Sequence, residues 1–189
     1  DLTHLPVPVQ RYLRRVGVVG QPRVWNVRAR MHGRIRRDPD SPWMPLAAEQ
    51  HNFYDEPTRL FYMDSSMFRL PVPGLHRYAG PSATMLVKVL GLVPVASAAG
   101  PEMDRAETVT LFNDMCFLAP ATLVDAAVTW EVPDPRTVRG TFTNAGHTIR
   151  ADLVFDEAGD LVNFRSDDRA RAGADGALRP SRWSTPLLD

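Results

Sequence analysis

The amino-acid sequence predicts an α+β fold in which a curved antiparallel sheet, or a partly open β-barrel, wraps around one or two helices. Three observations point to it: a long alternating segment near the start, one internal segment with clear helix signals, and several short alternating segments in the last third of the chain. Side chains of a strand alternate between the two faces of a sheet, so a period of two indicates half-buried strands.

A short helix is expected at the start of the chain. Pro6 and Pro8 stand where a first helical turn tolerates proline, and Gly17 follows as an end signal. The apolar stripe of this helix comprises Val9, Tyr12, Leu13 and Val16. We therefore expect an amphipathic helix that packs through this stripe.

The clearest alternation runs from Arg23 to Arg37. One side of this predicted strand carries Val27, Ala29, Met31, Gly33 and Ile35. The other side carries Arg28, Arg30, His32, Arg34 and Arg36. A helix would scatter the same arginines around its circumference, so the pattern favours a strand with one apolar face.

The middle of the chain predicts two further pairs of strands and a helix. The strands cover residues 46–54, 59–64, 75–78 and 83–90. The helix runs from Pro101 towards Leu118, because Pro101 suits the first helical position and Glu102 and Asp104 suit the positive end of the helix dipole. A short second helix is expected from Pro120 to Asp125.

The last third of the chain predicts an antiparallel meander. Its strands fall at residues 128–132, 138–142, 149–155, 162–164 and 178–184, and turns include 144–146 and 173–176. We expect one domain over residues 1–189, with further sheet sequence truncated or disordered beyond Asp189.

Composition narrows the function classes. Twenty-two basic and 22 acidic side chains give a formal charge of zero, which argues against a nucleic-acid binder that relies on bulk phosphate attraction. Cys116 is the single cysteine, so neither an internal disulfide nor a cysteine metal cluster can form. The longest apolar run, Met85 to Ala99, is interrupted and falls short of the roughly 20 residues that a membrane-spanning helix needs.

The sequence leaves two alternatives for the cellular compartment of the protein. The chain fits a cytoplasmic location, or an extracytoplasmic one if a leader upstream of Asp1 was removed. Membrane association would then run through a segment outside this chain.

Five segments resemble a large family of uncharacterised bacterial proteins, a domain of unknown function. They are Leu5–Leu13, Glu107–Cys116 with its Asn-Asp-Met-Cys, Leu118–Asp125 with its Ala-Pro-Ala-Thr-Leu, Thr143–Thr148, and the Ser-Asp-Asp-Arg of Ser166–Arg169. The layout is also similar, more loosely, to the periplasmic lipoprotein-carrier fold. That similarity implies an open curved sheet whose apolar concave side holds acyl chains, and it is an analogy of fold alone.

Asp114 is the first candidate for chemistry. It follows Asn113 inside the apolar run from Leu111 to Leu118, and a carboxylate is costly to bury unless it is paired or protonated. Asp114 therefore serves either as a general acid or base, with Asn113 beside it, or as the structural partner of an arginine.

Glu49 and His147 complete the candidate acid–base set. Glu49 and His51 stand two residues apart and point the same way, so they could exchange a proton near neutral pH. His147 follows a turn and could stand at a cavity mouth. The competing interpretations are a solvated sheet face for Glu49 and a hydrogen-bonding turn residue for His147.

The Ser166–Arg169 segment is not expected to form a paired-carboxylate site. Asp167 and Asp168 are adjacent in a strand and cannot face the same side, so salt bridges with Arg150 or Arg165 are the simpler expectation. No histidine or cysteine spacing typical of a metal site, phosphate-binding loop or nucleophile motif is present. The sequence therefore predicts no metal and no cofactor.

The leading functional hypothesis is binding of a lipid or other hydrophobic small molecule in the concave side of the sheet, without nucleic acid as a partner. Residues expected to contact this ligand are Met31, Met85, Leu86, Phe112, Asn113, Met115, Trp130, Arg28 and Arg30. One alternative is an enzyme that uses Asp114, His147 or Glu49 in the same cavity. The other is a membrane-tethered interaction module that uses the arginines of the first long strand.

Overall fold

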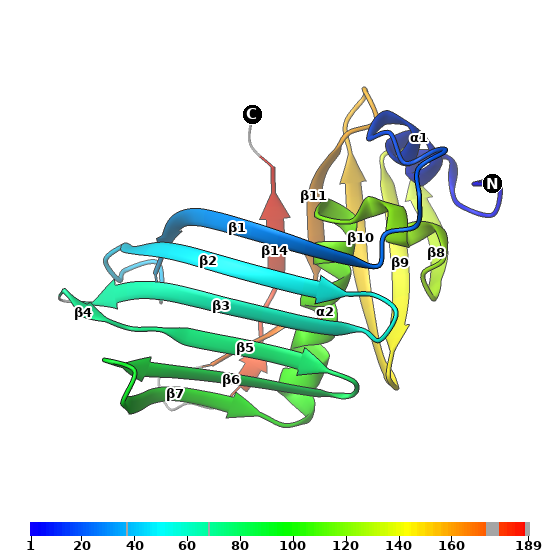
Figure 1. Ribbon diagram of the computed structural model, residues 1–189. Coiled ribbons are helices and arrows are strands. Elements are labelled where there is room, and N and C mark those ends of the chain that lie inside the picture. Colours follow the sequence, from blue (N-terminus) through cyan, green and yellow to red (C-terminus); the bar gives the residue numbers. More distant parts are fainter. Residues whose placement is uncertain (37, 68, 173–177, 188–189) are drawn as a thin grey trace. The chain divides into compact units, whose positions relative to one another are not determined.

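The computed structural model describes residues 1–36, 38–67, 69–172 and 178–187. They form open antiparallel sheets with a short N-terminal helix and one later α-helix, which confirms the predicted class (Figure 1). The strands divide between two main sheets. Contacts along the chain gather into two compact units, Trp25–Asp104 on the one hand and Asp1–Val24 with Arg105–Asp189 on the other. The expectation of a single domain stays a prediction.

The unit Trp25–Asp104 is built on one sheet with the strand order β1-β2-β3-β5-β6-β7, to which β4 is added beside β3. The strands are β1 (Asn26–Ile35), β2 (Met44–Phe53), β3 (Thr58–Met67), β4 (Leu70–Pro71), β5 (Gly74–Ala79), β6 (Ser82–Val89) and β7 (Val93–Ala99). Every pairing is antiparallel between neighbours in the order, so the unit is a meander of hairpins.

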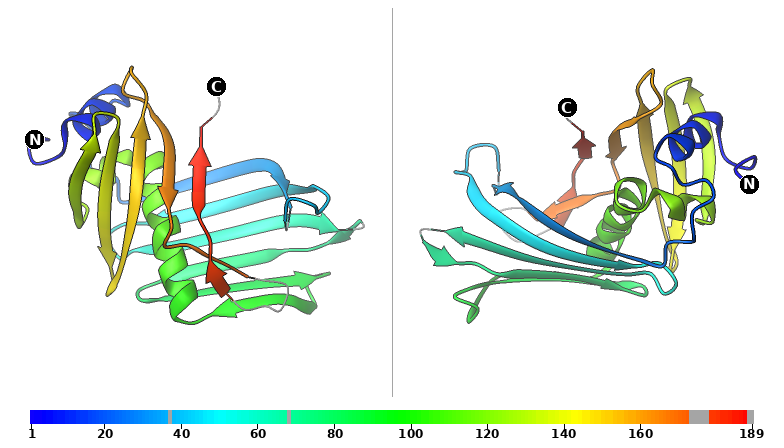
Figure 2. Two further views of the ribbon diagram at one scale, coloured as in Figure 1. Left: turned by 180° about the vertical axis from the view of Figure 1, so that it is seen from behind. Right: turned by 45° about the horizontal axis from the view of Figure 1, so that its top comes forward.

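Strand β1 has the predicted two faces and bends along its length together with β2 (Figure 2). Val27, Ala29, Met31 and Ile35 are half-buried, and the arginines between them are exposed. The strand begins at Asn26 and ends at Ile35, so it is shorter than the predicted strand, which begins at Arg23. The end of the predicted strand at Arg37 lies outside the described residues.

Strand β7 was not predicted. The apolar run Met85 to Ala99 consists of the end of β6, a tight turn and the whole of β7. The turn places Leu90 at φ 55° and Gly91 at φ 69°, and the Leu92 amide donates a hydrogen bond to the Val89 carbonyl at 3.0 Å. Both central residues of a type I′ turn need positive φ, and a leucine in the first position disguises the turn in the sequence.

The second unit carries the helices and a sheet with the order β14-β11-β10-β9-β8. Its helices are α1 (Val7–Arg15), α2 (Pro101–Phe117), which begins in the other unit, and the 3₁₀ helix η1 (Pro120–Val124). Its strands are β8 (Val128–Asp134), β9 (Thr137–Asn144), β10 (His147–Phe155), β11 (Leu161–Ser166), β12 (Ala170–Ala172), β13 (Leu178–Pro180) and β14 (Trp183–Pro186). The three predicted helices and the meander are therefore confirmed.

The strand predicted over residues 178–184 is in fact two strands in different sheets. β13 pairs with β12 in a small ribbon, and β14 pairs with β11 at the edge of the five-stranded sheet. Pro180 ends β13, since proline has no amide hydrogen to donate to a ladder. The turn predicted at 173–176 lies outside the described residues.

The core of this unit forms around Phe112 of α2. Its ring lies 5.0 Å from that of Phe142 and 5.7 Å from that of Phe164, between centroids, and Trp130 stands at its rim at 6.2 Å. Gly140 of β9 makes room for this cluster, because a Cβ there would lie 2.9 Å from the Phe112 ring and 3.0 Å from that of Trp130.

Helix α1 is tied to the same core through one hydrogen bond. The Tyr12 hydroxyl donates to the backbone carbonyl of Cys116 at 2.7 Å, and both residues are buried. Burial raises the pKa of the Tyr12 hydroxyl and of the Cys116 thiol, because a charged form is poorly solvated there. The apolar stripe predicted for α1 is buried at Val9, Tyr12 and Leu13, and Val16 lies exposed just past the helix end.

We predict that Gly140→Ala destabilises the protein by about 1–3 kcal/mol, because the added methyl group overpacks the Phe112 cluster. Gly33→Ala in β1 is the matched control, since a Cβ there meets nothing within 4 Å. Chemical denaturation followed by fluorescence measures both free energies of unfolding. An equal effect of the two substitutions would contradict the packing role of Gly140.

Candidate functional site

The best-formed candidate surface is one face of the seven-stranded sheet. Strand register places four methionines on this face, one from each of four strands: Met31, Met44, Met63 and Met85. All four are half-buried. We call this surface the methionine face. Apolar neighbours on it include Val27, Ala29, Ile35, Leu46, Ala48 and Phe61.

One end of the methionine face is polar. Gln50, Asn52 and Arg59 are buried there and linked by hydrogen bonds. The Gln50 amide donates to Asn52 Oδ1 at 3.1 Å, the Arg59 guanidinium donates to Gln50 Oε1 at 3.4 Å, and the Asn52 amide donates to the Tyr54 hydroxyl at 3.3 Å. This polar row was not predicted. Its signal in the sequence is the alternation of Gln50 and Asn52 with neighbours that lie on the other face of the sheet.

The opposite face of the same sheet, which we call the arginine face, carries Arg28, Arg30 and Glu49. Leu86 also lies there, although the sequence had placed it in one lining with Met31 and Met85. Met85 pairs with His76 and Ala98, so its strand neighbour Leu86 must point the other way, where it is exposed. Leu86 is therefore separated from the methionine face by the thickness of the sheet.

Glu49 is held by three basic side chains. Its carboxylate lies 2.8 Å from Arg28, 3.1 Å from Arg30 and 2.8 Å from the His51 ring nitrogen. Hydrogen bonds from Arg28 first, then from His51 and Arg30, lower the pKa of Glu49 to about 2. The expected proximity of Glu49 and His51 is observed. The ionised carboxylate of Glu49 holds Arg28, Arg30 and His51 together on the surface of the sheet.

Asp114 and Asn113 lie in the interior of α2 and are both buried. Glu107, Thr110 and Asp114 follow the helical spacing of one face, and Phe112 projects from the opposite side into its aromatic cluster. Phe112, Met115 and Trp130, expected to contact a ligand, thus lie in α2 and β8, and the rings of Phe112 and Trp130 belong to the unit's own core.

A buried ion pair joins α2 to the Ser166–Arg169 segment, and it was not predicted from the sequence. Glu107 is fully buried, and the Arg169 guanidinium approaches its carboxylate at 3.4 Å while lying 4.8 Å over the Trp183 ring. Asp168 accepts hydrogen bonds from the Arg105 side chain and the Arg150 amide, and Asp167 pairs with Arg182 at 3.1 Å. The two aspartates thus form salt bridges with Arg105 and Arg182 in place of the predicted Arg150 and Arg165, and Arg150 contributes its backbone amide.

His147 begins β10 opposite Asn144, next to a type I′ turn with Ala145 at φ 47° and Gly146 at φ 89°. It is half-buried in the unit that also holds Asp114, whereas Glu49 belongs to the unit Trp25–Asp104. Convergence of these three residues on one pocket, which the enzyme hypothesis requires, stays a prediction.

A pocket of about 450 Å³ lies beside η1 in the second unit, where apolar side chains such as Val18 and Val124 are mixed with charged ones such as Arg14. A hollow of about 200 Å³ on the five-stranded sheet is lined by arginines and aspartates, among them the bidentate pair Arg139–Asp152 at 2.7 and 3.1 Å. Within the described ranges, no three histidine, cysteine, aspartate or glutamate side chains gather to hold a metal ion. The described helices include none with the length and hydropathy required to span a bilayer.

We predict that the contribution of Glu49 to stability depends on pH in a specific window. Its folded pKa of about 2 lies below the ordinary value of 4.5, so its contribution is complete above pH 4.5 and is lost as the pH falls towards 2. The stability difference between wild type and Glu49→Gln should therefore shrink over this window in denaturant titrations at each pH. Glu56→Gln, which removes the same charge from an exposed turn, is the control. A difference that stays constant with pH would contradict the assignment.

Comparison with known proteins places the chain in a family. No curated protein and no solved structure matches it. A sequence model described as "Family of unknown function (DUF6544)" matches residues 1–189. The chain belongs to this family of unknown function, DUF6544.

Proposed function

We propose that the chain binds a lipid or another hydrophobic small molecule against the methionine face. The observation that carries this proposal is that Met31, Met44, Met63 and Met85 share one sheet face and are all only half-buried. An apolar sheet face gains free energy when it is covered. Side chains left half-exposed on such a face offer surface to a ligand.

Methionine suits this role better than β-branched side chains do. Its unbranched thioether adapts to ligands of irregular shape, and methionine is frequent on surfaces that bind varied apolar partners. Four strands each supply one methionine, so the adaptable surface extends across the sheet rather than along one strand.

The polar row on the same face gives the ligand a direction. Gln50, Asn52 and Arg59 lie on the end of the face near the β2–β3 hairpin, and Met31, Met44 and Met63 lie further along the same strands. An amphipathic molecule with an acyl tail and a polar or anionic head fits this order, with its tail on the methionines and its head near Arg59. Ligand pockets commonly combine apolar walls with a few placed polar groups in this way.

We predict that Met85→Gln weakens binding of a fluorescent fatty-acid probe by about tenfold or more, because it places a polar amide on the apolar face. Leu86→Gln is the matched control, since it makes the same kind of change one residue along the same strand but on the arginine face. Probe titration gives both dissociation constants, and native mass spectrometry shows whether a lipid co-purifies.

Two results would count against the proposal. One is equal weakening by Met85→Gln and Leu86→Gln, which would separate binding from the methionine face. The other is purified protein with no co-purifying lipid and no saturable binding of the probe.

A further inference from the structure

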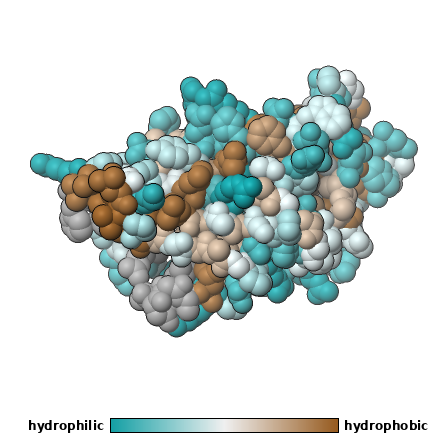
Figure 3. Space-filling view, turned by 60° about the horizontal axis from the view of Figure 1, so that its bottom comes forward, coloured by the Kyte–Doolittle hydropathy of each residue, from teal (hydrophilic) through white to brown (hydrophobic). Residues whose placement is uncertain are grey.

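One end of the seven-stranded sheet exposes a group of large apolar side chains. It is the end at which β1, β3 and β6 finish and β2, β4 and β7 begin, on the left in Figure 1. We call this group the apolar end; it comprises Trp43, Leu70, Leu90, Leu92 and Val93, which are 45–76% exposed. Hydrophobic side chains gather at the left of the space-filling view as well (Figure 3).

Backbone hydrogen bonds hold the β6–β7 turn against β4. The Leu90 amide donates to the Pro71 carbonyl at 2.8 Å, and the Lys88 amide donates to the Pro73 carbonyl at 3.0 Å. Leu70, which precedes Pro71, is thereby kept beside the turn that carries Leu90 and Leu92. These side chains are presented together by a fixed backbone.

The turn itself is occupied in an unusual way. Leu90 takes the first central position of a type I′ turn at φ 55°, a position that asparagine, aspartate and glycine adopt far more readily. Its side chain is 52% exposed, so packing within the chain offsets little of this strain. A strained and exposed leucine points to a use for its side chain outside the chain.

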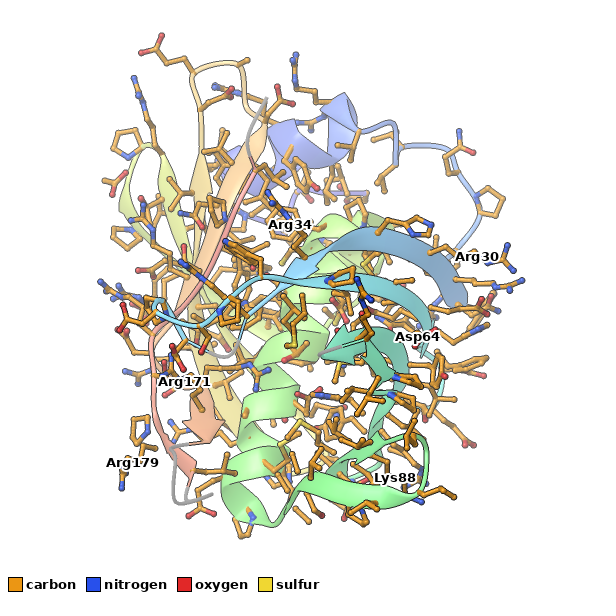
Figure 4. The ribbon with its side chains drawn as sticks, turned by 90° about the vertical axis from the view of Figure 1, so that its left-hand side faces the viewer. Arg30, Arg34, Asp64, Lys88, Arg171 and Arg179 are labelled. Carbon is orange, nitrogen blue, oxygen red and sulfur yellow. The ribbon has the colours of Figure 1, made fainter. Side chains whose placement is uncertain are left out.

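Basic side chains border the apolar end. Arg34 and Arg36 lie over the Trp43 ring at 5.7 and 4.5 Å from its centroid, and Arg69 and Lys88 stand next to Leu70 and the turn. Figure 4 looks onto this end and shows Arg34 and Lys88 towards its two edges. Acidic residues of the same end, among those described, are Asp38, Asp40 and Asp64. Exposed tryptophan and leucine beside arginine and lysine are typical of surfaces at the boundary of a bilayer.

We propose that the apolar end is a docking surface for an anionic phospholipid bilayer. Leu90 and Leu92 enter the acyl region, Trp43 lies at the headgroup level, and Arg69 and Lys88 contact lipid phosphates. The apolar residues come from three separate connections at one end of the sheet rather than from a flat face, and such protruding tips suit insertion into a fluid layer better than packing against a rigid protein.

Sedimentation with phospholipid vesicles tests the proposal. The double variant Leu90→Asn/Leu92→Ser should lower the partition coefficient of the full chain by about a hundredfold, since each of the two inserted leucines contributes on the order of a tenfold factor. Asparagine suits the turn, so this variant keeps the fold, which a thermal melt verifies. Arg69→Gln/Lys88→Gln should weaken binding to vesicles that contain phosphatidylglycerol and leave binding to pure phosphatidylcholine unchanged.

Leu75→Ser/Leu86→Ser is the matched control, because both leucines are exposed on the arginine face of the same sheet. Unchanged binding by Leu90→Asn/Leu92→Ser, or an equal loss in the control, would overturn the proposal. So would a wild-type chain that sediments with neither vesicle type but forms a dimer that Leu90→Asn/Leu92→Ser abolishes. Met85→Gln should not alter sedimentation, so failure of ligand binding at the methionine face can be told apart from failure of membrane docking.

Discussion

The burial of α2 determines what the surrounding residues of its unit must supply. Val109, Leu111 and Phe112 are almost fully buried, and so are the polar residues Glu107 and Asp114 of the same helix. A helix buried around its circumference must supply partners for its polar groups as well as packing for its apolar ones. The aromatic cluster around Phe112 supplies the apolar packing. The Arg169 guanidinium supplies a partner for the polar group of Glu107. The Ser166–Arg169 segment therefore belongs to the support of a buried helix.

Local signals in the sequence were sufficient for most elements. The alternation around Met31 and the proline before Glu102 each concern residues adjacent in the chain, and both predicted the observed element. Strand β7 was missed because Leu90 occupies a turn position where asparagine or glycine is the usual signal. The strand over 178–184 was predicted as one because alternation alone does not show that Pro180 separates two different pairings.

For the candidate sites too, features that depend on neighbouring residues were predicted, and contacts between distant segments were not. Alternation correctly placed Met31 and Arg30 on different faces of the sheet, and Glu49 on the same face as His51. It also requires Met85 and Leu86 to face opposite ways, a consequence that grouping residues by hydrophobicity overlooked. The pairing of Glu107 with Arg169 depends on how α2 packs against a segment far along the chain, and no spacing in the sequence encodes it. The two surfaces of the seven-stranded sheet are thus readable from the sequence, and the buried ion pair is not.

The burial of Cys116 has a practical consequence. Its thiol is inaccessible in the folded unit, and a reagent that needs the thiolate meets a group whose pKa is raised by burial. Covalent labelling of the single cysteine therefore requires the helical unit to open. The rate of thiol labelling in the absence of denaturant therefore measures how often the core around α2 becomes exposed to solvent.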